Sequence, residues 1–101
     1  MATPAQNPIP GYALAAPTEQ DAITFLARAL GADRAVSLWV RTCQDAGVRS
    51  GKLALDELER AALALAKHEG VAGVIGNSMV IRLRTYRLLE RSRQLQGEGG
   101  R

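Results

Sequence analysis

The stretch that decides the fold is GVAGVIGNSMVIRLRTYRLLERSR, residues Gly70 to Arg93. A glycine stands at every third position at its start, an apolar run follows, and arginines enter from position 82 onward. Asn77 or Ser78 can cap a helix that runs to about Gln94, because a short polar side chain accepts a hydrogen bond from the first turn. Residues 71–76 admit three interpretations, namely a helical lead-in, a tight turn or a short extended run.

On a helix with about 100° per residue, this stretch has two different faces. One face carries a cationic stripe, with small residues in line toward the N-terminus. The other face is a broad apolar arc with Arg82 in its middle. A buried unpaired guanidinium is too costly, so Arg82 must reach water, pair with a carboxylate such as Glu90, or face a partner. The apolar arc consists of Ile75, Met79, Leu83, Tyr86 and Leu89.

Three shorter helices are predicted before this stretch. The first begins near Thr18, where a hydroxyl followed three residues later by Asp21 fits a capping box, and Gly31 stops it. The second spans 33–46, with Asp33 as a cap, an apolar face around Trp39 and a left-handed stop at residue 47. The third spans 54–69, with acidic residues in its first turns that complement the helix dipole.

The composition predicts one all-α domain, a small four-helix bundle-like fold. The chain has 101 residues, of which 47% are hydrophobic and 4% aromatic, and the apolar content is mostly Ala, Leu and Val. Ala and Leu favour helices, and no alternating pattern is long enough for a sheet. We expect a flexible or extended N-terminal arm over 1–16, a single helical domain over 17–94 and a disordered tail over 95–101.

Charge is distributed unevenly along the chain. The net charge is +3, but residues 1–77 carry seven Lys/Arg and eight Asp/Glu, whereas residues 78–101 carry six Arg and two Glu. The body is therefore near neutral and the C-terminal part is cationic. Such asymmetry suits nucleic acid, an acidic protein or a lipid surface, and it equally suits a solvated helix end, where the dipole favours cations.

Several classes of protein are disfavoured. A single cysteine, Cys43, excludes an intramolecular disulfide, and no signal peptide precedes the domain, so we expect a cytoplasmic location. No run approaches the length of a membrane span. His68 is the only histidine, which excludes a His-rich zinc site within one chain, and no nucleophile–base pair can be assembled from spacing. We therefore expect no enzyme activity, no metal and no cofactor, with Cys43 and Trp39 as core residues and His68 at a helix end.

The leading hypothesis for function is a non-enzymatic protein–protein interaction or assembly module. A folded part of about 75–80 residues is marginal alone and is often helped by oligomerisation, so a homodimer through the C-terminal helix is expected. In this hypothesis the glycines allow close approach, apolar residues anchor the contact and an arginine orients it. The predicted interface residues are Gly73, Gly76, Val80, Ile81, Arg82 and Leu88.

The alternative hypothesis is a small basic nucleic-acid-binding protein. Arg84, Arg87 and Arg91 could contact phosphates without reading sequence. A helix-turn-helix motif has partial support from the glycine turn at residue 70, but no base-reading donor precedes Arg82 in the would-be recognition helix. A phosphate-binding glycine loop lacks the preceding strand and the GK[ST] ending.

Overall fold

The structure is a computed structural model that describes the backbone of residues 15–99 and the side chains of residues 15–94. Within that part of the chain it has four helices and no strand, which confirms the all-α prediction. The helices are α1 (Glu19–Leu30), α2 (Ala32–Ala46), α3 (Leu55–Ala66) and α4 (Val71–Gly99). Most of the predicted N-terminal arm and the last two residues of the predicted tail lie outside the described residues.

The ends of the first two helices follow from local chemistry. Thr18 Oγ1 accepts a hydrogen bond from the Asp21 amide at 3.1 Å, and the Asp21 carboxylate accepts one from the Thr18 amide at 2.9 Å. This is the predicted capping box. Gly47 adopts a left-handed φ of 77° and ends α2 as expected. The start of α2 differs from the prediction, because Gly31 alone joins it to α1 and Asp33 lies in the first turn rather than at the cap.

The third helix is shorter at both ends than predicted. Its N-cap is Ala54, whose amide donates to Glu57 Oε1 at 2.9 Å, and its last helical residue is Ala66. The chain then turns through Lys67–Gly70, where Gly70 has a φ of 75°. The turn is tight enough for α4 to fold back along α3.

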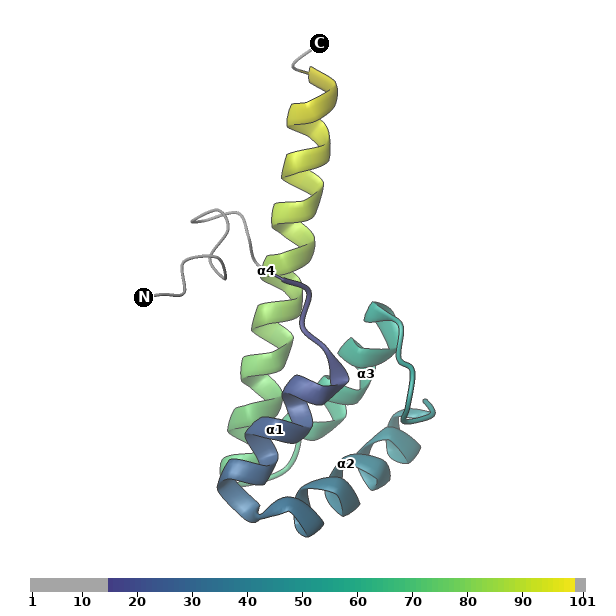
Figure 1. Ribbon diagram of the computed structural model, residues 1–101, viewed down its shortest axis with the longest axis vertical. Helices are drawn as coiled ribbons and strands as arrows, with labels where there is room; N and C mark the ends of the chain where they lie inside the picture. Colours follow the sequence, from purple (N-terminus) through teal and green to yellow (C-terminus); the bar gives the residue numbers. More distant parts are fainter. Residues whose placement is uncertain (1–14, 100–101) are drawn as a thin grey trace, which may run out of the picture.

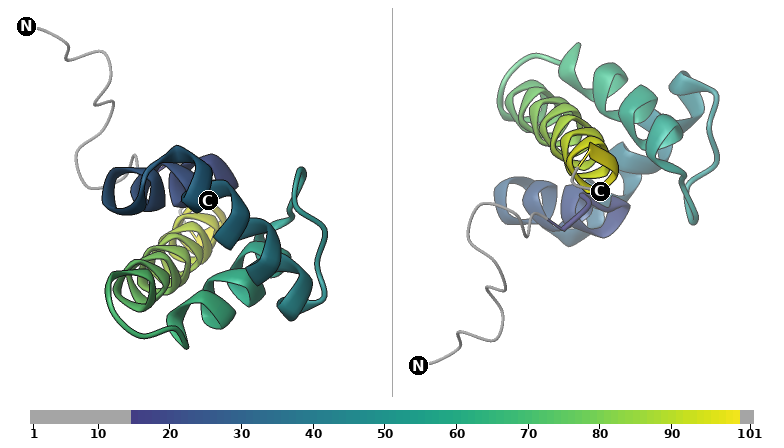
Figure 2. Two further views of the ribbon diagram at one scale, coloured as in Figure 1. Left: turned by 90° about the horizontal axis from the view of Figure 1, so that it is seen from below. Right: turned by 90° about the horizontal axis from the view of Figure 1, so that it is seen from above.

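The fourth helix is the longest element, with 29 residues. It begins at Val71 rather than at Asn77 or Ser78, so residues 71–76 are a helical lead-in, and it continues past the predicted end at Gln94. Figure 1 shows α1, α2 and α3 gathered around its N-terminal part, while its C-terminal part projects beyond them. Views roughly along α4 place α1 and α3 on different sides of it (Figure 2).

The core lies where the four helices meet. α4 packs chiefly against α3 and also against α1, and α2 closes the body by packing on α1 and α3. Trp39 is fully buried at the centre, and Cys43 is 1% exposed, as the sequence predicted for both. The other large side chains buried with them are Leu26, Leu58, Leu65, Met79 and Leu83.

Candidate interaction surface on the fourth helix

The inner face of α4 is used within the chain. Gly73 and Gly76 are buried, and a side chain at either would overlap the backbone of α3 or of the turn that follows it. A Cβ on Gly76, for example, would lie 2.7 Å from both Ala66 Cα and Leu65 C. Val80 is only 6% exposed. The close approach predicted for these three residues therefore occurs between α3 and α4 of one chain, and they are not available to a partner in the folded protein.

The outer face of α4 carries a row of exposed apolar side chains. Val74, Ile81 and Leu88 are 66%, 64% and 66% exposed, and they stand seven residues apart. Seven residues are close to two helical turns, so the three lie nearly in line along α4. Two of the predicted interface residues, Ile81 and Leu88, are in this row.

Arg82 lies beside this row and packs on α1. Its guanidinium is 4.8 Å from the centroid of the Phe25 ring, and Arg28 lies 6.0 Å from the same ring. The attraction between the guanidinium and the Phe25 ring stabilises an arginine within the apolar arc of the helix. Pairing with Glu90, one of the options that the sequence left open, does not form, because Glu90 contacts Arg93 at 3.5 Å and the Tyr86 hydroxyl at 3.4 Å.

Two shallow hollows run along the junction of α1 and α4, with Arg82 common to both. The first, of about 380 Å³, has an apolar lining and contains both arginines that flank Phe25. The second, of about 530 Å³, lies farther along α4 and reaches the residues that precede α1. The first is lined by Phe25, Arg28, Ala29, Val71, Val74, Ile75, Ser78 and Arg82.

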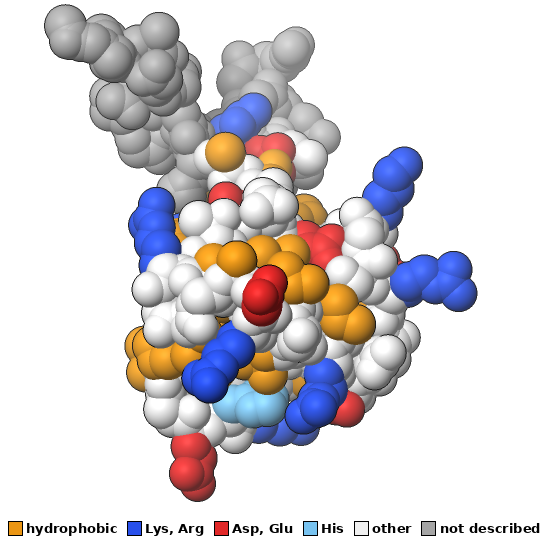
Figure 3. Space-filling model, turned by 60° about the horizontal axis from the view of Figure 1, so that its bottom comes forward, with side chains coloured by type: hydrophobic (Ala, Val, Ile, Leu, Met, Phe, Trp, Pro, Cys, Tyr) orange, Lys and Arg blue, Asp and Glu red, His pale blue; other side chains and the backbone are white. Residues whose placement is uncertain are grey.

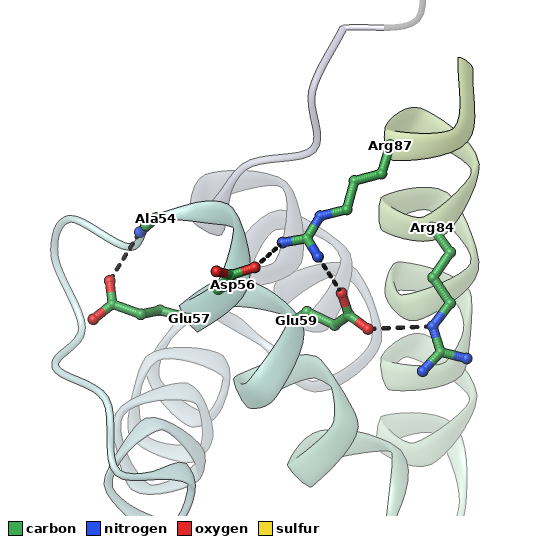
Figure 4. A network of polar contacts seen from close by, with 6 residues as sticks. All are labelled: Ala54, Asp56, Glu57, Glu59, Arg84 and Arg87. Carbon is green, nitrogen blue, oxygen red and sulfur yellow. Dashed lines mark hydrogen bonds and ion pairs between the residues drawn. The ribbon is translucent and has the colours of Figure 1, made fainter. Parts of the chain in front are cut away.

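The cationic stripe of α4 is largely neutralised by acids of α3. Arg87 contacts Asp56 at 2.6 Å and Glu59 at 3.1 Å, and Arg84 contacts the other oxygen of Glu59 at 3.2 Å (Figure 4). The Glu59 side chain is only 17% exposed. Asp56 and Glu59 are two of the acidic residues predicted to complement the dipole of the third helix, and in the structure they join α3 to α4. Of the three arginines predicted to contact phosphate, Arg91 is exposed and has no ion pair among the side chains of residues 15–94.

A polar cluster missed by the sequence analysis centres on Glu19. Its carboxylate accepts hydrogen bonds from Trp39 Nε1 at 2.7 Å, Ser50 Oγ at 2.6 Å and the Gly51 amide at 3.0 Å. Burial opposes ionisation, but these hydrogen bonds outweigh it and lower the pKa of Glu19. The cluster ties α1 to α2 and to the loop before α3. The Glu19 carboxylate accepts a hydrogen bond from each of these three donors, so the cluster has a structural role.

The cysteine, the histidine and the acidic side chains that the structure describes form no reactive or metal-binding group. Burial raises the pKa of the Cys43 thiol to about 11, with a further contribution from the charge of Glu19, so the thiolate is disfavoured at neutral pH. His68 is exposed in the turn after α3. Within residues 15–94, no three His, Cys, Asp or Glu side chains come together as a metal site.

Apolar and charged side chains alternate on the end of the molecule opposite the projecting part of α4 (Figure 3). Seen from the end opposite the projecting part of α4, apolar side chains form patches separated by charged ones rather than one continuous apolar surface (Figure 3). None of the helices in residues 15–99 has both the length and the apolar character needed to cross a bilayer.

Comparison of the chain with protein-family models, with curated proteins and with solved structures finds no match.

Proposed function

We propose that this protein is a non-enzymatic interaction module that self-associates through the outer face of α4. The observation that carries the proposal is the pair Ile81 and Leu88, each about two-thirds exposed, on a helix whose C-terminal part projects from the body. Apolar side chains of this size gain about 1.5–3 kcal/mol each on full burial. A second copy of α4 offers a matching surface by symmetry.

The projecting part of α4 also favours a partner for reasons of helix stability. Arg91–Gln94 are all exposed, and the backbone remains helical to Gly99. These turns extend a helix that is already nucleated, but propagation alone contributes little in water, and most helical stability in proteins comes from tertiary packing. Packing against another helix would stabilise these turns.

The experiment is light scattering at micromolar concentration on the wild-type chain, Leu88→Glu and the control Gln94→Glu. Position 94 is exposed on a different side of α4, so the control introduces the same charge away from the row. We expect twice the mass of one chain for the wild type and Gln94→Glu, and a monomer for Leu88→Glu with unchanged helical circular dichroism. A monomeric wild type would remove the proposal.

Nucleic-acid binding is the competing proposal and has less support. Two of its three arginines, Arg84 and Arg87, already pair with α3 carboxylates, and a phosphate would have to displace those acids. Fluorescence anisotropy with duplex DNA at low salt tests it. Binding that weakens steeply with salt and is reduced by Arg91→Glu would favour it over self-association.

A further inference from the structure

We infer that the first hollow between α1 and α4 binds a small apolar molecule that ends in a carboxylate. The hollow has a volume of about 380 Å³, at the lower end of the range of small-molecule sites. Its lining is apolar apart from Arg28, Ser78 and Arg82. The site is separate from the surface proposed for self-association, because it is built from one chain and includes neither Ile81 nor Leu88.

The apolar part of the hollow is formed where the N-terminal part of α4 lies beside the C-terminal part of α1. Val71 and Val74 of α4 are 45% and 66% exposed. Ile75 of the same helix and Phe25 and Ala29 of α1 complete the apolar lining. Removing such side chains from water is favourable, so this part of the hollow suits a hydrocarbon chain or ring.

The two arginines of the hollow share one aromatic ring. The guanidinium carbons of Arg82 and Arg28 lie 4.8 Å and 6.0 Å from the centroid of the Phe25 ring, so both are close to the same part of the hollow. Among the side chains of residues 15–94 neither arginine forms an ion pair, whereas the two arginines of α4 that face α3 are paired with its acids. Neighbouring cations repel each other, and a bound anion would relieve that repulsion.

Arg82 has no competing partner at the junction of α1 and α4. Asp21 lines the second hollow together with Arg82, but no ion pair joins these two side chains. The Asp21 carboxylate instead accepts a hydrogen bond from the Thr18 amide at 2.9 Å. The charge of Arg82 is therefore available to a ligand in the first hollow.

The polar side chains of the lining match a carboxylate better than a peptide or a phosphate. A guanidinium donates two parallel hydrogen bonds to a carboxylate, and the Ser78 hydroxyl can donate another. A peptide segment would also bring amide N–H groups, and Ser78 Oγ is the only side-chain oxygen of the lining that could accept from them. A phosphate monoester carries nearly twice the charge of a carboxylate, so moving it into an apolar hollow costs more desolvation.

Titration with sodium octanoate, followed in two-dimensional amide NMR spectra, tests the inference. Octanol has the same chain without the charge, and acetate has the charge without the chain. We expect octanoate at millimolar concentration to shift the amide signals of residues 25–29 and 71–82 in a saturable way. Octanol and acetate should each bind at least about fivefold more weakly, because each lacks one of the two contributions.

Four variants locate the site. Arg82→Gln and Arg28→Gln each remove one charge and should weaken octanoate binding by up to about fivefold, as expected for a partly exposed charge contact. Ala29→Leu keeps both arginines but occupies part of the hollow, so it should weaken binding as well. Arg91→Gln is the matched control, because it removes an exposed arginine of α4 that does not line the hollow.

Three results would overturn the inference. They are octanol binding as tightly as octanoate, equal effects of Arg82→Gln and Arg91→Gln, and octanoate shifts that are absent or spread over all four helices. The comparison of octanoate with octanol uses the wild type alone, so it decides the question even where a variant fails to fold. A monomeric wild type would remove the proposed self-association and leave this site standing.

Discussion

The contact between α3 and α4 predicts that Gly76→Ala destabilises the fold, against the usual preference of helices for alanine. Ala in place of Gly in a helix interior ordinarily stabilises by about 0.5–1 kcal/mol. Here the added Cβ would come within 2.7 Å of Ala66 Cα and Leu65 C, which are backbone atoms that cannot rotate away. The two helices would have to separate, and overpacking of this kind costs about 1–3 kcal/mol.

The net expectation for Gly76→Ala is a loss of about 1–2 kcal/mol, or roughly 5–15 °C in Tm for a domain of this size. Thermal unfolding followed by circular dichroism, at equal protein concentration, measures it. Ser78→Ala on the exposed side of the same helix is the control and should melt at or slightly above the wild-type temperature. A Gly76→Ala variant at least as stable as the wild type would refute the close-approach argument.

Three further predictions concern side chains in and around the core. Because the folded-state pKa of Glu19 is lowered, its contribution to stability is present above its ordinary pKa of 4.5 and is lost as pH falls through the folded value. Glu19→Gln places an amide NH₂ among three hydrogen-bond donors, so it should lower Tm at neutral pH and weaken the dependence of Tm on acid pH. Trp39 fluorescence is the readout. Cys43 should react with a thiol reagent only at the rate of unfolding in native buffer and rapidly in urea, and fast native labelling would contradict its burial. Arg87→Ala should cost no more than about 1 kcal/mol in urea unfolding, because Asp56 is 85% exposed and Glu59, although only 17% exposed, keeps its contact with Arg84 at 3.2 Å.

Features governed by neighbouring residues could be predicted from the sequence. The Thr18–Asp21 capping box and the left-handed Gly47 depend on chemistry within a few residues, and both occur as expected. Trp39 and Cys43 are buried as their helical spacing indicated, whereas Val36 and Val40 of the same predicted apolar face are 48% and 38% exposed. These predictions needed no knowledge of how the helices pack.

The misplaced features depend on contacts between distant parts of the chain. The sequence left residues 71–76 open between a helical lead-in, a turn and an extended run; although Gly73 and Gly76 have low helix propensity, packing against α3 makes glycine necessary there and the helix begins at Val71. Packing against a neighbouring helix overrode local preference.

The same limit applies to the polar contacts. Glu19 meets its partners 20 and 31 residues away, and Arg84 meets Glu59 25 residues away. Side-chain spacing on one helix gives no information on such pairs. For the candidate surface, the sequence pointed to the last helix and to Arg82, and the structure separated the exposed apolar row of that helix from its buried glycine face.

The most direct test of the central claim is sedimentation equilibrium over a range of concentrations, comparing the wild type with Leu88→Glu. Each copy buries one Leu88 that is now two-thirds exposed, so the substitution should cost about 2–4 kcal/mol in the pair, or roughly a hundredfold in the dissociation constant. The account predicts a wild type that is dimeric at micromolar concentration and dissociates on dilution, and a monomeric Leu88→Glu that keeps its helical circular dichroism. Equal dissociation constants for the two chains, or a wild type that stays monomeric throughout, would contradict it.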